Sequence, residues 1–109
     1  MKVLIATRHC DVPESVRMRA EEQAERLTRY DQSLTGIEIV FETEKHLKRV
    51  EGILSIERGA PIVTTGEGSE FRAALDQMLD RASRMLRRHR EQSRDHQGPK
   101  LSESPPAEA

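Results

Sequence analysis

Eight apolar residues recur at helical spacing late in the chain, and this pattern constrains the fold more than any other feature. They fall at i, i+3, i+4, i+7, i+8, i+11, i+14 and i+15, which at about 100° per residue places them in one sector of a helix. Ser69 is placed to cap this helix, and helix-compatible residues continue to about position 96. A long helix with one apolar face must bury that face against another element, so its methionines are interpreted as core residues. The stripe consists of Phe71, Ala74, Leu75, Met78, Leu79, Ala82, Met85 and Leu86.

A second, thinner apolar stripe lies earlier in the chain. Asp11, Pro13 and Glu14 together are a typical helix-start signal. From there to about position 30, apolar residues recur at helical spacing among glutamates and arginines, which predicts an amphipathic helix. Its apolar positions are Val16, Ala20, Ala24 and Leu27.

The middle of the chain has the two-residue period of strands. Residues 37–44 alternate apolar with mostly acidic positions after a break at 34–36, which predicts a strand with one covered and one wet face. After a predicted turn at 45–48, a second alternating run follows. We expect Val50, Leu54 and Ile56 to point inward there, and Arg49, Glu51, Ser55 and Glu57 to point outward.

Two further short strands complete the set of predicted elements. Residues 58–61 predict a hairpin turn, and residues 62–65 a strand that ends at Gly66-Glu67-Gly68, interpreted as a turn. Residues 2–7 are short, apolar and rich in branched side chains, which predicts a buried strand.

The order is therefore β-α-β-β-β-α, an α+β class. Three consecutive strands joined by short turns favour an antiparallel meander, and two helices with one apolar face each favour a two-layer sandwich with both helices on one face of the sheet. We expect one domain over residues 1–96. Residues 97–109 are rich in Ser, Pro, Glu and Ala, which predicts a disordered tail.

Several functional classes are disfavoured. The chain has one cysteine, so it forms no internal disulfide and fits a reducing cytoplasm. No apolar run approaches the ~18 residues of a membrane span. No pair of histidines has metal-site spacing, no carboxylates are spaced as an acid–base pair, and Cys10 is interpreted as a small buried residue. We therefore predict no enzyme, metal, cofactor or small-molecule substrate.

The strongest functional signal is a basic cluster at the end of the predicted last helix. Residues 81–96 hold six arginines against two acids, although the whole chain has a formal net charge of −1. One row is spaced i, i+3, i+7, and the other arginines spread over the opposite flank. The planar guanidinium binds phosphate oxygens in pairs and stays charged, so the cluster predicts RNA binding. Its members are Arg81, Arg84, Arg87, Arg88, Arg90 and Arg94.

The same composition indicates how RNA is recognised. Only three residues are aromatic, which favours recognition of folded RNA by its backbone and shape over stacking of unpaired bases. Arg17 and Arg26 of the first predicted helix have two readings. They extend the RNA-binding surface, or they pair with interleaved glutamates at i, i+4.

Four segments of the sequence form a recognisable set. They are Thr7-Arg8-His9, Leu27-Thr28-Arg29-Tyr30, Thr43-Glu44-Lys45, and above all the run from Glu67 to Asp76 with the basic helix ending Arg88-His89-Arg90. Together they resemble the short form of the ribosome hibernation-promoting factor and ribosome-associated inhibitor family, also labelled sigma-54 modulation proteins. The resemblance covers roughly residues 2–96.

The resemblance implies a domain like a double-stranded-RNA-binding domain with an added strand. It also implies binding in the decoding cleft of the small ribosomal subunit, in the cytoplasm, where translation is blocked by occupancy and no reaction is catalysed. The family's basic positions correspond to Lys45, Arg81, Arg84, Arg88 and Arg90, and further to Arg17, Arg26 and Arg94. The long form's dimerisation domain is absent, so we expect a monomer.

Two other functions stay open at this point. One is a generic module for structured RNA elsewhere, and the other is a protein–protein regulator of an alternative sigma factor. Strong salt dependence of binding would favour either RNA-binding function over the protein–protein regulator. Competition by initiator transfer RNA separates the ribosome from other RNAs.

Overall fold

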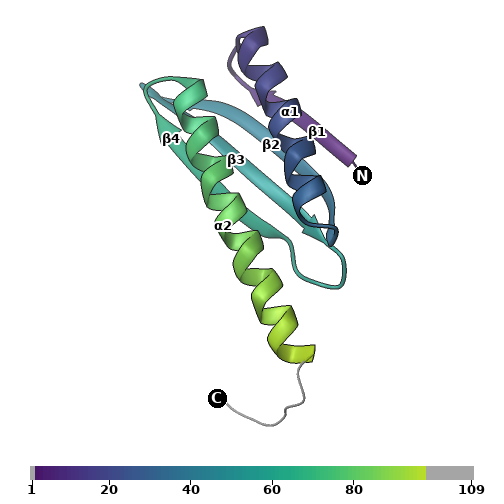
Figure 1. Ribbon diagram of the computed structural model, residues 1–109. Coiled ribbons are helices and arrows are strands. Elements are labelled where there is room, and N and C mark those ends of the chain that lie inside the picture. Colours follow the sequence, from purple (N-terminus) through teal and green to yellow (C-terminus); the bar gives the residue numbers. More distant parts are fainter. Residues whose placement is uncertain (1, 98–109) are drawn as a thin grey trace.

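The computed structural model describes residues 2–97, and the side chains of residues 2–92 (Figure 1). Its element order is β-α-β-β-β-α, which confirms the predicted order. The predicted tail lies outside the described residues except for Gln97, which ends the last helix. The elements are β1 (Lys2–Arg8), α1 (Glu14–Tyr30), β2 (Leu34–Glu44), β3 (Leu47–Ile56), β4 (Ile62–Gly68) and α2 (Phe71–Gln97).

The four strands form one sheet in the order β1-β2-β3-β4. β1 runs parallel to β2, because α1 connects them as a crossover, whereas β2, β3 and β4 form an antiparallel meander. Both helices cover the same face of this sheet, α1 over β1 and β2, and α2 over β3 and β4 (Figure 1). The two-layer α+β sandwich that the sequence predicts is therefore the observed fold.

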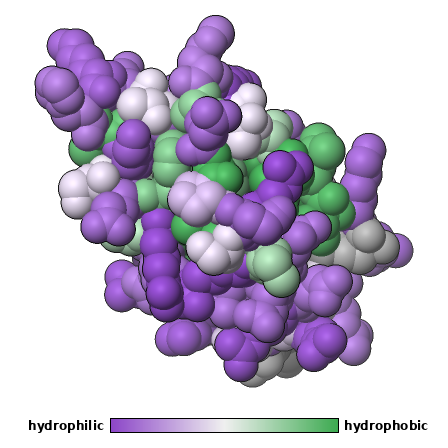
Figure 2. Space-filling model, turned by 90° about the horizontal axis from the view of Figure 1, so that it is seen from above, coloured by the Kyte–Doolittle hydropathy of each residue, from purple (hydrophilic) through white to green (hydrophobic). Residues whose placement is uncertain are grey.

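The core lies between the sheet and the two helices. Phe41, Val50 and Leu54 from the sheet are fully buried, as are Leu75 and Leu86 from α2. The rings of Phe41 and Phe71 meet edge to face, with centroids 5.7 Å apart and planes at 82°. The outer surface is largely hydrophilic, with apolar side chains gathered in the middle of the face in Figure 2.

Two glycines let α2 lie close to the sheet. A Cβ on Gly66 would collide with the carbonyl oxygen of Ala74 in α2, and one on Gly52 would meet the side chain of Met78. The prediction that 66–68 is a turn was wrong. These residues continue β4, because they pair with Lys48, Arg49 and Val50 of β3. The absence of a side chain at Gly66 leaves the space that α2 occupies.

Three element boundaries also differ from the prediction. β2 begins at Leu34, before a register shift at Gly36, and the predicted turn at 45–48 is reduced to Lys45 and His46. α2 begins at Phe71, and its first backbone hydrogen bond runs from Ala74 N to the carbonyl oxygen of Glu70. Glu70, rather than Ser69, therefore occupies the capping position.

Three burial predictions were wrong as well. β1 is an edge strand with one face uncovered, so Leu4 is 46% exposed, whereas Val3 and Ile5 pack against the core. Val40 was placed on the wet face, yet it is 1% exposed because β2 is an interior strand. Met85 is 37% exposed, at the margin of the apolar stripe.

Candidate nucleic-acid interface

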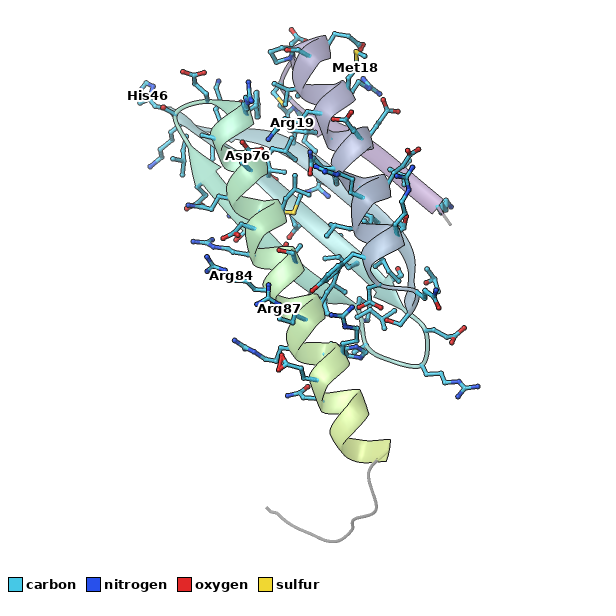
Figure 3. The ribbon with its side chains drawn as sticks, viewed as in Figure 1. Met18, Arg19, His46, Asp76, Arg84 and Arg87 are labelled. Atoms are coloured by element: carbon cyan, nitrogen blue, oxygen red, sulfur yellow. The ribbon has the colours of Figure 1, made fainter. Side chains whose placement is uncertain are left out.

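Three arginines line the flank of α2 that faces away from α1, and we call Arg81, Arg84 and Arg88 the outer row. Arg81 Nη1 donates to the carbonyl oxygen of Thr65, 2.8 Å away, on the free edge of β4. Arg84 forms an ion pair of 2.8 Å with Asp80 one turn earlier, but its side chain is 69% exposed, so the pair is weak. The outer row therefore presents guanidinium groups to solvent, as Figure 3 shows for Arg84.

The opposite flank of α2 holds Arg87 and Arg90, which we call the inner pair. Arg90 reaches the end of α1, where its Nη1 donates to the carbonyl oxygen of Tyr30 at 3.1 Å and its Nη2 to the Tyr30 hydroxyl at 3.2 Å. Its guanidinium also lies over the Tyr30 ring, 4.5 Å from the centroid. The pKa of Tyr30 is lowered, first by a hydrogen bond from Arg87 and further by the charge and hydrogen bond of Arg90.

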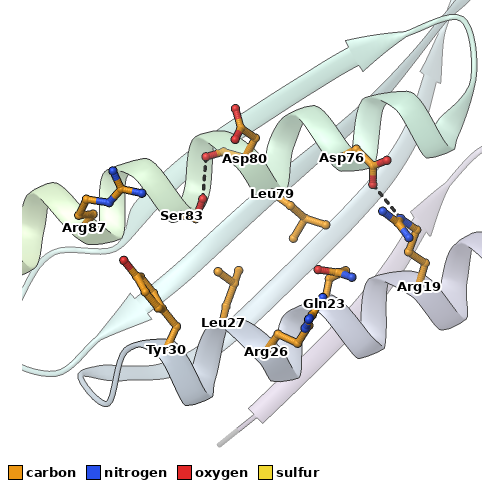
Figure 4. A pocket seen from close by; sticks show the side chains of 10 residues that line it. All are labelled: Arg19, Gln23, Arg26, Leu27, Tyr30, Asp76, Leu79, Asp80, Ser83 and Arg87. Carbon is orange, nitrogen blue, oxygen red and sulfur yellow. Dashed lines mark hydrogen bonds and ion pairs between the residues drawn. The ribbon is translucent and has the colours of Figure 1, made fainter.

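A hollow of about 620 Å³, the interhelical groove, lies between α1 and α2 (Figure 4). Arg26 and Tyr30 line it from α1, and Leu79 and Arg87 line it from α2. Its volume is within the range of ligand-binding clefts. The groove therefore combines an apolar floor with cationic sides, which suits a ligand with both a flat apolar part and an anionic part.

The far end of this groove is closed by an ion pair between the helices. Arg19 Nε donates to Asp76 Oδ1 at 2.8 Å, and this contact raises the pKa of Arg19. Figures 3 and 4 show the two side chains pointing toward one another from α1 and α2. The pair fixes the spacing of the helices at this end and neutralises an acid that would otherwise repel an anionic ligand.

The structure gathers only some of the residues that the sequence singled out. Arg26 joins the inner pair at the interhelical groove. Arg17 lies on another side of α1, near β1, together with Glu21 and Glu25. Lys45 is at the β2–β3 turn beside His46, which Figure 3 places near the start of α2 and away from Arg84. The side chain of Arg94 lies outside the described residues.

Sequence reasoning left Tyr30 and Arg19 out of the predicted site. Both share a helical stripe with Arg26, since Arg19, Arg26 and Tyr30 fall at i, i+7 and i+11. That spacing is a signal that points to one face of α1. It does not show that the face lies against α2, because the packing of the helices is a tertiary feature.

The described residues contain no group of three or more His, Cys, Asp and Glu side chains that would hold a metal ion. Cys10, predicted to be buried, is half-buried, and its thiol donates to the carbonyl oxygen of Phe41 at 3.4 Å. Within residues 2–97, no helix is both long and apolar enough to cross a membrane. The arginine flanks and the groove between the helices are thus the features that require a functional account.

Comparisons with known proteins place the chain in context. The family model described as "Sigma 54 modulation protein / S30EA ribosomal protein" matches residues 3–94. A ribosome hibernation promoting factor of Azotobacter vinelandii is 31% identical over 106 residues, which cover 96% of this chain and 98% of the relative. The factor of the same name from Escherichia coli K12 is 23% identical over 96 residues, covering 88% and 100% of the two chains.

Two solved structures share the fold. A ribosomal subunit interface protein from Coxiella burnetii superposes with a TM-score of 0.76 at 18% identity, covering 84% of this chain and 99% of that one. The N-terminal domain of Protein Y from Thermus thermophilus superposes with a TM-score of 0.69 at 21% identity, covering 82% and 99%. Arrangements of this kind therefore occur in proteins with quite different sequences.

Proposed function

Because the chain belongs to the sigma 54 modulation protein / S30EA ribosomal protein family, we propose that it is a ribosome hibernation factor. It binds the RNA of the small ribosomal subunit in the decoding cleft. There it occupies the space of messenger and transfer RNA and so blocks translation in the cytoplasm. No bond is made or broken, because occupancy alone excludes the competing RNAs.

The observation that carries this proposal is the arrangement of arginines on α2. The outer row and Arg87 put guanidinium groups on both flanks of one helix, so one helix can reach phosphates on two sides at once. A helix between two RNA backbones fits a cleft better than an open RNA surface. The strong, salt-dependent affinity expected from several phosphate contacts also fits a ribosomal RNA target.

The proposal is tested by cosedimentation with purified small subunits over a series of salt concentrations. The test variant carries Arg84→Gln and Arg88→Gln, which leaves the Arg81 contact to Thr65 in place. We expect the wild type to pellet with the subunit at low salt. The double variant should bind more weakly, and the slope of log affinity against log salt should fall by about two, one for each lost phosphate contact.

A matched control removes two arginines from the opposite side of the molecule. Arg8 and Arg49 lie on the sheet face that no helix covers, and each neighbours Glu42. The variant with Arg8→Gln and Arg49→Gln should bind like the wild type. Equal weakening of both double variants would mean that the contact surface is not α2.

The other readings correspond to other outcomes. If initiator transfer RNA does not compete with the bound protein, the protein occupies RNA outside the decoding cleft. If the wild type fails to pellet even at low salt, the ribosome is not its target. A protein partner, such as a sigma factor, then becomes the better candidate.

A further inference from the structure

Tyr30 is the only aromatic side chain at the described surface. The chain has three aromatic residues, and the other two, Phe41 and Phe71, are buried in the core. Tyr30 is 43% exposed at the end of α1. A single exposed ring between basic side chains is a natural stacking partner for a nucleobase, because every base has a π-face.

The ring is held in a fixed position. The Arg90 guanidinium lies over it, 4.5 Å from the ring centroid, and hydrogen-bonds both the Tyr30 hydroxyl and the Tyr30 carbonyl oxygen. Arg87 lines the same groove as the ring, and its influence is the largest cause of the lowered pKa of Tyr30. A ring fixed at its hydroxyl end and over its face loses little further freedom when a ligand stacks on it.

The interhelical groove provides space beside this ring. Figure 4 shows Tyr30 rising from α1 toward Arg87 of α2, with Leu27 and Leu79 beside it in the groove. Arg26 and Arg87 provide positive charge on both sides. The two acids of the groove, Asp76 and Asp80, are both paired with arginines, Asp76 with Arg19 and Asp80 with Arg84.

We propose that the interhelical groove takes up one unpaired nucleotide of RNA. The base stacks on the Tyr30 ring above Leu27 and Leu79, and its phosphate lies against Arg26 and Arg87. This inference rests on the proposed function, since the nucleotide is taken to belong to the RNA of the small subunit. It adds a single stacking contact to a surface that otherwise binds the RNA backbone.

The test compares Tyr30→Leu with Tyr30→Phe in titrations with purified small subunits over a salt series. Leucine keeps an apolar side chain but removes the π-face, whereas phenylalanine keeps the ring and loses only the hydroxyl. We expect Tyr30→Leu to weaken binding at least about fivefold, and Tyr30→Phe to retain most of the affinity. The salt slope should not change in either variant, because no phosphate contact is lost, whereas Arg87→Gln should lower it by about one.

Two outcomes of this comparison overturn the inference. If Tyr30→Leu binds as tightly as the wild type, the ring contacts no base. If Tyr30→Phe is as weak as Tyr30→Leu, the hydroxyl acts by positioning the arginines and stacking is not involved. Both outcomes leave the proposed function standing, whereas failure of the wild type itself to bind small subunits contradicts the function and the inference together.

A second measurement needs no variant. It tests whether Tyr30 contacts a nucleotide even if Tyr30→Leu does not fold. The complex of wild-type protein and small subunit is irradiated with ultraviolet light, digested with nuclease and protease, and analysed by mass spectrometry. Tyr30 is the only tyrosine in the chain, so an adduct on it is assigned without ambiguity. We expect a nucleotide attached to Tyr30, and adducts found only elsewhere in the chain would overturn the inference.

Discussion

At the scale of single residues, His9, Lys45 and Arg58 have a positive φ, and of these only Lys45 belongs to the predicted site. Its φ is 60°, in the left-handed region that favours glycine, and it lies in the two-residue turn between β2 and β3. A side chain there costs about 1–2 kcal/mol relative to glycine. Under the proposed function, an RNA contact by the turn would offset that cost.

Lys45→Gly should therefore separate stability from binding. We expect the free energy of unfolding in denaturant to rise by about 1 kcal/mol, because glycine adopts this φ without steric cost. The affinity for small subunits should fall at the same time, because a positive charge is lost. Lys45→Arg keeps both the charge and the strain and serves as the control. A Lys45→Gly protein that binds as tightly as the wild type would remove Lys45 from the site.

Tyr30 shows why residue counts did not predict the whole site. Three aromatic residues in the composition argue against stacking, and for Phe41 and Phe71 that argument holds because both are buried. The number of aromatic residues does not predict which of them are exposed. It also does not predict the contact between Tyr30 and Arg90, which are sixty positions apart. The two arginine flanks of α2, in contrast, follow from helical geometry alone.

At the scale of elements, the contact between β4 and α2 depends on Gly66. The strand and the helix approach so closely that a Cβ on this residue would overlap the backbone of Ala74 and Met78. Backbone cannot move aside as a flexible side chain can, so any substitution must push α2 away from the sheet. The position of the arginines depends on the same contact, since α2 carries them.

Gly66→Ala should accordingly destabilise the protein by about 3 kcal/mol or more, measured by denaturant unfolding. Gly68→Ala in the same strand is the matched control, because a Cβ there would lie 3.4 Å from its nearest neighbour, the Cβ of Ala73. We expect the control to change stability by less than about 1 kcal/mol. Similar losses of stability in both variants would mean that glycine is needed by the strand itself and not by the packing of α2 on the sheet.

The elements themselves were largely predictable from sequence, because apolar periodicity records which face of a helix or strand is covered. The predicted stripe of α2 and the inward residues Val50, Leu54 and Ile56 are indeed buried, apart from the partly buried Leu79 and the exposed Met85. The extent of β4 was not predictable, since Gly66-Glu67-Gly68 is locally typical of a turn. The strand continues because these residues pair with β3, and the helix packed above it explains why Gly66 has no side chain. For the same reason the sequence could not tell that Arg17 and Lys45 lie apart from the interhelical groove.

At the scale of the whole molecule, the excess of positive charge belongs to one helix. The arginine flanks lie on α2, on the helical side of the sandwich. The uncovered face of the sheet carries Glu38, Glu42, Glu51 and Glu67, with Arg8 and Arg49 among them. A net charge near zero thus hides a basic helix and a sheet face on which these acids outnumber the arginines, which we call the acidic side.

The acidic side should orient the protein and reduce binding to RNA in general. We expect Glu38→Gln with Glu51→Gln to raise affinity for an unrelated RNA duplex about two- to fivefold at low salt. The gain should vanish at high salt because exposed charges are screened. Affinity for small subunits, which we propose bind through α2, should change little. Equal gains for both RNAs, measured side by side, would mean that these glutamates do not confer selectivity.

The close packing of α2 against Gly52 and Gly66 also has a consequence for the kinetics of binding. A helix fixed to its sheet before it meets a target needs no folding step on contact, so association is governed by collision and by long-range attraction. The lifetime of the complex then depends on how many contacts must break together, because a stiff body cannot release them one at a time. Gly52 and Gly66 have no side chain that could contact a ligand. By fixing α2 they nevertheless help to set the association rate and the lifetime of the complex.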